Sequence, residues 1–220
     1  MVKTFIDPDF QIHQSCTRLI NILLYSLSCS TIIPVNFHHL SQQILRDYNQ
    51  QSIDLQLRNL LDNNDDNDAN EKSINFLYES MKIFDNATEQ WQNEMEKFNY
   101  TDQPLAIRRV NDLIILIERS FATKLLPLDG NKEIRNLLYG TLSTNFYKTI
   151  LFPGIMNLIA EINDEQWMKV QQNGLTREEL TRIDHNIDRL KRTLRRHLND
   201  ISLAFRNAAK LLRRIRIPII

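Results

Sequence analysis

The sequence predicts an all-α fold, a bundle of about five or six helices in a single domain of 220 residues. Three observations predict it. Apolar residues recur every three or four positions over long stretches, which is the period of a helix with one buried face. No segment shows convincing alternation of apolar and polar residues, the pattern of a strand. The chain has only four Gly and six Pro, too few for the many turns of an all-β fold.

Two segments carry the most regular spacing. In residues 74–98 and 180–215 the apolar positions step by threes and fours without a slip. Thr176 and Glu179 form a capping-box pattern, in which each side chain pairs with a free backbone donor at the other residue. The last helix is therefore expected to span residues 177–216. Apolar stripes of this width suit a packed bundle.

Start signals place the other helices. Asp7 suits the cap of a first helix, and Asn36 suits the cap of a second, which we expect to run unbroken over residues 36–61. The spacing of a buried face predicts a helix over residues 107–121. Pro153 suits the first turn of a further helix, because its missing N–H would have no partner there.

One polar stretch separates these helices. Residues 63–71 read NNDDNDANE, and their only apolar residue is Ala69. Such a segment cannot bury apolar surface, so we expect an exposed, disordered-type loop. Acidic residues dominate residues 62–102 and basic residues dominate the last helix, as expected of two solvated faces that partly neutralise each other. The formal net charge is zero, which gives no general attraction to nucleic acid or anionic membrane.

Cysteines and hydropathy give little information on compartment. Cys16 and Cys29 fall on one predicted helix, about 20 Å apart at 1.5 Å per residue. Because a disulfide needs Cα atoms within about 7 Å, we expect both to be free, and buried. No apolar run approaches the roughly 18 residues of a membrane-spanning helix. The sequons at Asn86 and Asn99 are candidate glycosylation sites.

A search for catalytic or metal-binding constellations finds none that is self-sufficient. The cysteines lack CxxC spacing, and no two histidines have the i, i+4 spacing of a helical zinc site. There is no phosphate-binding glycine loop and no GxSxG motif. We therefore expect no catalytic residue and no metal ligand in this chain. The histidines are His13, His38, His39, His185 and His197, of which the last falls in an apolar stripe and is expected to be a core residue.

The basic last helix supports an alternative function. It contains RLKRTLRRHL and KLLRRIRI, which are amphipathic as well as basic. A helix of this kind can bind an anionic membrane, RNA or an acidic partner. Phe205 is the only aromatic residue among the basic ones, so stacking on bases is unsupported. Binding would be salt-sensitive and would depend on Arg192, Arg195 and Arg196.

Four segments between residues 104 and 162 point to a family. They are, in order, NDLIILIERSF, LPLDG, NFY and FPGIMNLIAEI. Their order and spacing resemble the C-terminal helical domain of the transferrin receptor and glutamate carboxypeptidase family. The segment around Asp7 and the last helix resemble other parts of the same region. The resemblance implies a transferrin receptor-like dimerisation domain that covers most of the chain.

The resemblance also implies a role. In that family, which includes zinc metallopeptidases, the helical domain supplies most of the homodimer contact and one wall of the active-site cleft. Its peptidase domain binds two zinc ions through residues upstream of the region that this chain matches. We therefore expect a truncated relative whose activity is association, either as a homodimer or against a peptidase domain. The alternative is the C-terminal part of a zinc metallocarboxypeptidase. The implied location is the luminal or extracellular side of a membrane-anchored parent protein.

One functional stretch of that family falls inside this chain. Its glutamate-specific peptidases carry an Asn-Lys-Tyr run before Phe-Pro-Gly, and the Lys and Tyr hold the substrate's terminal carboxylate. The matching run here is Asn145, Phe146 and Tyr147. The resemblance thus implies Asn145 and Tyr147 as substrate-pocket residues. Phe146 in place of Lys removes the cation that would pair with a carboxylate, so specificity for glutamate is not expected.

Overall fold

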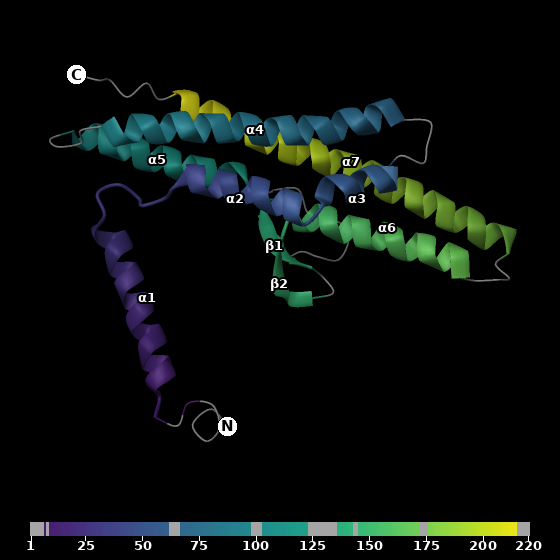
Figure 1. The fold of residues 1–220 in the computed structure, drawn as a ribbon, viewed down its shortest axis with the longest axis horizontal. Coiled ribbons are helices and arrows are strands. Elements are labelled where there is room, and N and C mark those ends of the chain that lie inside the picture. The colour runs from purple at the N-terminus through teal and green to yellow at the C-terminus, as the bar shows by residue number, and fades with distance from the viewer. Residues whose placement is uncertain are drawn as a thin grey trace. The chain divides into compact units, whose positions relative to one another are not determined.

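The computed structural model describes Asp7 and residues 9–61, 67–97, 103–122, 136–142, 145–171 and 176–214. The described part is almost entirely helical, which confirms the all-α class (Figure 1). The residues form two compact units, Met1–Val35 with Asn99–Ile114, and Asn36–Phe98 with Ile115–Ile220. Each unit is described below by itself.

The first unit contains α1 (Gln11–Cys29) and the start of α5 (Pro104–Ser120). Asp7 lies before α1, and its carboxylate accepts hydrogen bonds from the backbone N–H of His13, at 2.9 Å, and from the His13 ring. It thereby satisfies a free donor of the first turn, but the N-cap position is occupied by Phe10 and not by Asp7 as predicted, because the helix begins only at Gln11. Asn111 fixes the segment after α1, because its amide pairs with Ile33 N and with Thr31 O, both at 3.0 Å.

No residue of α1 is buried. The expectation of buried cysteines is therefore wrong, since Cys16 and Cys29 are free but exposed. The apolar stripe of α1 led to the expectation that this face is covered by other residues of the chain. Within the described residues nothing covers that stripe.

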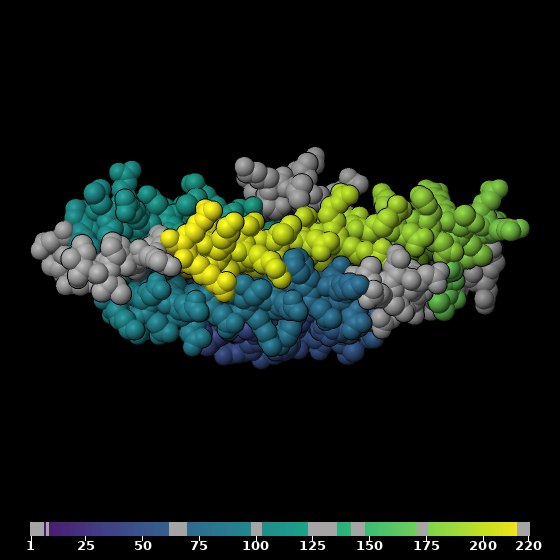
Figure 2. Space-filling model, turned by 90° about the horizontal axis from the view of Figure 1, so that it is seen from above, coloured from purple at the N-terminus to yellow at the C-terminus, as the bar shows by residue number. Residues whose placement is uncertain are grey.

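The second unit contains α2 (Phe37–Gln50), α3 (Ile53–Leu61), α4 (Asn67–Lys97), the end of α5, β1 (Tyr139–Leu142), β2 (Asn145–Leu151), α6 (Pro153–Gln171) and α7 (Arg177–Arg214). The longest helices, α4 and α7, lie side by side and run in the same direction (Figures 1 and 2). Arg195 Nε donates to Asn70 Oδ1 at 2.6 Å, and Arg206 Nε donates to Ser80 Oγ at 3.0 Å. Arg206 Nη2 also lies 4.0 Å from Glu79 Oε2, which is a charge pair of the kind predicted between the acidic and basic faces.

The described chain has seven helices rather than five or six, because one predicted helix is divided. The stretch 36–61 breaks between α2 and α3 at Ser52, whose φ of 51° lies in the left-handed region. The N–H of Ser52 bonds to Asn49 O at 3.1 Å, which closes the turn. Asn36 does cap α2, since its side chain accepts from His39 N at 2.8 Å.

Two further expectations are corrected. The loop at 63–71 is shorter than predicted, because residues 67–71 form the first turn of α4 and residues 63–66 lie outside the described part. The absence of strands is wrong, since β1 and β2 form an antiparallel pair with Tyr139 opposite Leu151. The two strands are short and their pairing contains a register shift, so the sequence shows little of the apolar–polar alternation by which strands are recognised.

The last helix begins where the capping box predicted. Thr176 N donates to Glu179 Oε2 at 2.8 Å, and Glu179 N donates to Thr176 Oγ1 at 3.3 Å. The described helix ends at Arg214, and the predicted end at residue 216 lies outside the described residues. The core of this unit centres on Phe205 of α7, whose ring contacts the rings of Phe84, Phe121 and Phe152.

Candidate functional site

The β1–β2 hairpin is anchored to the turn between α2 and α3. Tyr139 Oη donates to Asp47 Oδ2 at 2.8 Å, and Leu151 N donates to Gln51 Oε1 at 3.3 Å. Burial raises the pKa of the Tyr139 hydroxyl above its ordinary value, and the bond to Asp47 raises it further. The proton therefore stays on Tyr139 at neutral pH, and the hairpin is fixed to α2.

The hairpin carries the pocket residues implied by resemblance. Asn145 and Tyr147 both lie on β2. Their side chains fall outside the part that the structure describes, so their role in a substrate pocket stays a prediction. The backbone places them just before the junction of β2 with α6, where Phe152 has a φ of 51°. A buried phenylalanine rarely adopts this conformation, and it lets the chain turn sharply into Pro153.

His197 of α7 packs on the first turn of α6. A Cβ atom added at Gly154 would lie 3.2 Å from His197 Nδ1, so the ring occupies the space that a side chain there would need. Burial lowers the pKa of His197, Arg196 lowers it further and Asp200 opposes both. His197 is therefore neutral at pH 7. It is half-buried at the α6–α7 contact, whereas the sequence predicted a core residue.

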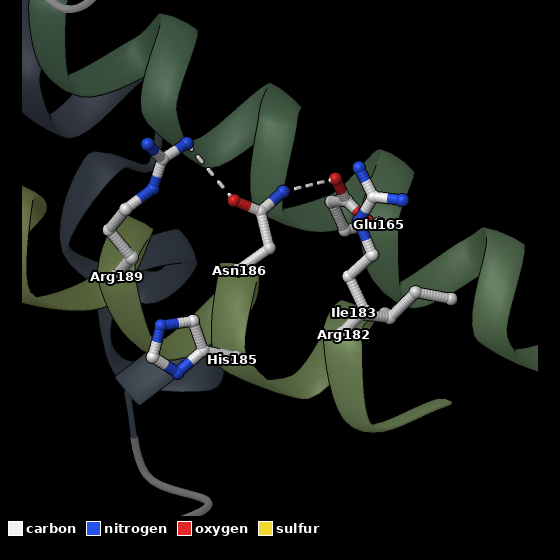
Figure 3. A pocket seen from close by; sticks show the side chains of 6 residues that line it. All are labelled: Glu165, Arg182, Ile183, His185, Asn186 and Arg189. Atoms are coloured by element: carbon white, nitrogen blue, oxygen red, sulfur yellow. Dashed lines mark hydrogen bonds between the residues drawn. The ribbon is translucent and has the colours of Figure 1, made fainter. Parts of the chain in front are cut away.

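An open groove of about 650 Å³ lies between α6 and α7 (Figure 3). Asn186 is its central residue, donating to Glu165 of α6 and accepting from Arg189 at 3.0 Å. Arg182, Ile183 and His185 complete the lining. Arg182, His185 and Arg189 are solvent-exposed, and Figure 3 shows the α7 side chains spread along the helix rather than converging on one point. The groove holds a hydrogen-bonded helix contact, and the residues lining it offer no activated nucleophile.

The described residues contain no group of three or more His, Cys, Asp or Glu side chains that could hold a metal ion. Among the predicted histidines, His13 pairs with Asp7 and His185 lines the groove. His38 Nδ1 lies 3.7 Å from Asp85 Oδ1, between α2 and α4. His39 is exposed on α2. Each histidine lies in a different local setting, so the described part offers no ligand set for zinc.

Sequence reasoning missed a polar cluster between α2 and α4. Ser41 Oγ contacts Asp85 Oδ1 at 2.5 Å and Thr88 Oγ1 at 3.0 Å. Thr88 is the hydroxyl residue of the Asn86 sequon, and it is fully buried while Asn86 itself is exposed on α4. Glycosylation of Asn86 stays a prediction, and Asn99 lies outside the described residues. No sequence spacing signals this cluster, because its members come from two helices.

The basic helix is partly engaged inside the unit. Arg195 bonds to Asn70, and the Arg206 guanidinium lies 4.2 Å from the centre of the Phe76 ring. Arg192 and Arg196 are exposed. At least two of the basic side chains therefore contribute to the α4–α7 contact. No described helix is long and apolar enough to cross a membrane.

Comparison with known proteins decides the family. Residues 66–213, from the N-terminus of α4 almost to the end of α7, match the family described as the transferrin receptor-like dimerisation domain. The chain belongs to this family. The match covers the two long parallel helices, the hairpin and α6, so the resemblance drawn from NDLIILIERSF and FPGIMNLIAEI is confirmed.

Two curated relatives are similar over a wider stretch. Aminopeptidase NAALADL1 of mouse is 27% identical over 179 residues, which are 78% of this chain and 22% of the relative. The rat protein of the same name is 27% identical over 176 residues, with the same coverage. The chain thus spans about a fifth of the length of the relatives it matches. It is a helical dimerisation-type domain, as the sequence predicted.

Proposed function

We propose that this chain associates with a second copy of itself through the helices of its second unit. The observation that carries the proposal is the family match over residues 66–213, which lies on α4 to α7. Large apolar side chains are left exposed within that stretch, among them Leu116, Trp167 and Leu203. Burial of such surface stabilises a complex by roughly 25 cal/mol per Å² before the entropic costs of association.

Sedimentation equilibrium of the 220-residue chain tests this proposal. We expect a reversible dimer whose fraction rises with concentration over about 1–100 µM, the affinity range expected of an interface of modest size. Thermal stability should rise with concentration as well, because a dimer stabilises the folded chain by mass action. A strict monomer over the whole range would contradict the proposal.

A second candidate role is docking against a peptidase domain, and α1 favours it. This helix carries an apolar stripe that no described residue covers, formed by Ile12, Cys16, Leu19, Ile20, Leu23, Leu24 and Leu27. The opposite side carries polar residues such as Gln14 and Asn21. A stripe this wide suits a broad surface, such as another domain, better than a single helix. It lies outside the family match, so it can act independently of the dimer contact.

Hydrogen exchange tests the docking role. The chain is mixed with the part of mouse aminopeptidase NAALADL1 that lies outside the aligned region. We expect the amides of α1 to exchange about tenfold more slowly in the mixture, because docking suppresses local opening. A variant with Leu19→Glu and Leu23→Glu is the control, and it should lose this protection. Unchanged exchange in α1 of the original chain would argue against docking.

A further inference from the structure

Helix α6 has an apolar inner side and a second row of uncharged residues. The inner side is buried in the unit and consists of Ile155, Leu158, Ile159 and Ile162. The second side faces solvent, and we call it the outer seam, formed by Met156, Ala160, Asn163, Trp167 and Val170. Met156 and Ala160 are half-buried, and the other three are exposed. Trp167 is 61% exposed and Val170 is 80% exposed, so the apolar end of the seam lies almost fully in water.

The spacing of the outer seam is that of a helix–helix contact. Its residues follow one another by steps of four, three, four and three, the pattern of a narrow coiled-coil seam. The seam is about 21 Å long at 1.5 Å per residue.

Three charged residues of α6 lie away from the seam, namely Glu161, Glu165 and Lys169, whereas the exposed Asp164 borders it between Ala160 and Trp167. Glu165 accepts from Asn186, and Lys169 pairs with Asp184, so both point toward α7. Glu161 lies four residues before Glu165 and thus on the same side of the helix. Trp167 lies two residues after Glu165, nearly opposite it around the helix. An exposed helix face normally carries charged residues, so an uncharged row with a tryptophan indicates a contact surface.

We propose that the outer seam is the contact through which α6 packs antiparallel on α6 of a second copy, across a two-fold axis. This inference rests on the proposed self-association and names its surface. A two-fold contact must be self-complementary. In an antiparallel pair centred on Asn163, the small Ala160 lies opposite the large Trp167, and Met156 lies opposite Val170. A parallel pair would instead place tryptophan against tryptophan and alanine against alanine, which packs unevenly.

The seam also explains why the dimer should be weak. A single helix pair of this length covers less than the about 800 Å² per partner of a standard interface. Tryptophan is the residue type that most often dominates binding in such contacts. We therefore expect Trp167 to carry most of the affinity, with Asn163 near the middle of the seam setting the register, as a single polar residue does in coiled coils.

Sedimentation equilibrium of two matched variants tests the seam. Trp167→Glu places a charge in the seam and should raise the dimer dissociation constant at least about thirtyfold. Met168→Glu also replaces an exposed apolar residue of α6 by Glu, but it lies outside the seam and should leave the constant within about threefold of the original. A dimeric chain that tolerates Trp167→Glu overturns the seam and leaves self-association intact. A monomeric original chain overturns the self-association itself.

Cross-linking tests the direction of packing. In a background with Cys16→Ser and Cys29→Ser, Asn163→Cys should be joined between copies by a short bis-maleimide. Val170→Cys should not, because antiparallel packing places the two copies of residue 170 many residues apart along the helix axis. Equal cross-linking of both variants would show a parallel contact and overturn the antiparallel arrangement, while a failure of both would overturn the seam.

Discussion

Replacing Phe205 with alanine is expected to lower the free energy of unfolding by about 4 kcal/mol, the range of Phe→Ala changes in protein cores. Phe205 is fully buried in α7. Its ring centre lies 5.6 Å from that of Phe84, 5.2 Å from that of Phe121 and 6.1 Å from that of Phe152. These three rings come from α4, the residue that follows α5 and the junction of β2 with α6. One side chain thus joins three parts of the chain.

The size of the effect follows from rigid surroundings. Phe84 and Phe152 are themselves fully buried, and Phe152 is held in a left-handed backbone conformation. The neighbours can collapse only partly into the space that the ring leaves, so a cavity term adds to the lost burial. Edge-to-face contacts between aromatic rings add further stabilisation. A loss of 4 kcal/mol is a large share of the stability of an ordinary domain.

Urea unfolding followed by circular dichroism measures this loss. Protein concentration is held constant across variants, because dimer formation would otherwise change the apparent stability. Leu55→Ala is the control, since Leu55 lies on α3 of the same unit, outside the family match, and is exposed, and the change should cost less than about 0.5 kcal/mol. A loss below about 1.5 kcal/mol for Phe205→Ala would mean that the four rings are not a packed core.

Local rules predicted the elements whose signals lie within a few residues of one another. The capping box at Thr176 fixed the start of α7, and Pro153 fixed the start of α6. The regular stripes of α4 and α7 predicted helices that pack together, although their parallel course could not be read from spacing. The overlooked seam on α6 was visible in the sequence as a second row beside Ile155 and Ile162, and a search for rows on both sides of each helix would have found it.

The missed features depend on contacts between distant residues. The hairpin has few residues and is fixed by Tyr139 meeting Asp47, 92 positions away in sequence. The break at Ser52 depends on a backbone conformation that carries no Gly or Pro signal. Residues 67–71 look like a loop because Asn70 is polar, yet Asn70 is buried by its tertiary partners. Tertiary packing decided each of these, and no local pattern reports it.

Replacing Asn70 with leucine is expected to lower the free energy of unfolding by about 3 kcal/mol. The change leaves two polar groups at a buried position without the hydrogen bonds that the Asn70 amide makes to them. Asn70 is only 1% exposed. Its Nδ2 donates to Leu61 O, the last carbonyl of α3, at 2.9 Å. Its Oδ1 accepts from Arg195 Nε at 2.6 Å, a hydrogen bond from a charged group. One amide therefore joins the end of α3, the first turn of α4 and the middle of α7.

The reason for the cost is that leucine offers neither a donor nor an acceptor. The Leu61 carbonyl lies at a helix end, where it has no partner within α3, and the Arg195 guanidinium loses one of its contacts. Asn70→Asp should cost less than Asn70→Leu, because the carboxylate still accepts from Arg195. The coupling energy between Asn70→Leu and Arg195→Leu in a double-mutant cycle should be about 1–2 kcal/mol.

The matched control is Asn75→Leu, on the same helix. Asn75 accepts from Arg58 at 3.0 Å, but this contact is exposed, so its loss should cost less than about 0.5 kcal/mol. Urea unfolding at constant protein concentration gives both values. Equal losses for Asn70→Leu and Asn75→Leu would mean that burial adds nothing to the Asn70 contacts. A larger loss at Asn70 would instead show that α4 begins at residue 67 because its first turn is held between α3 and α7.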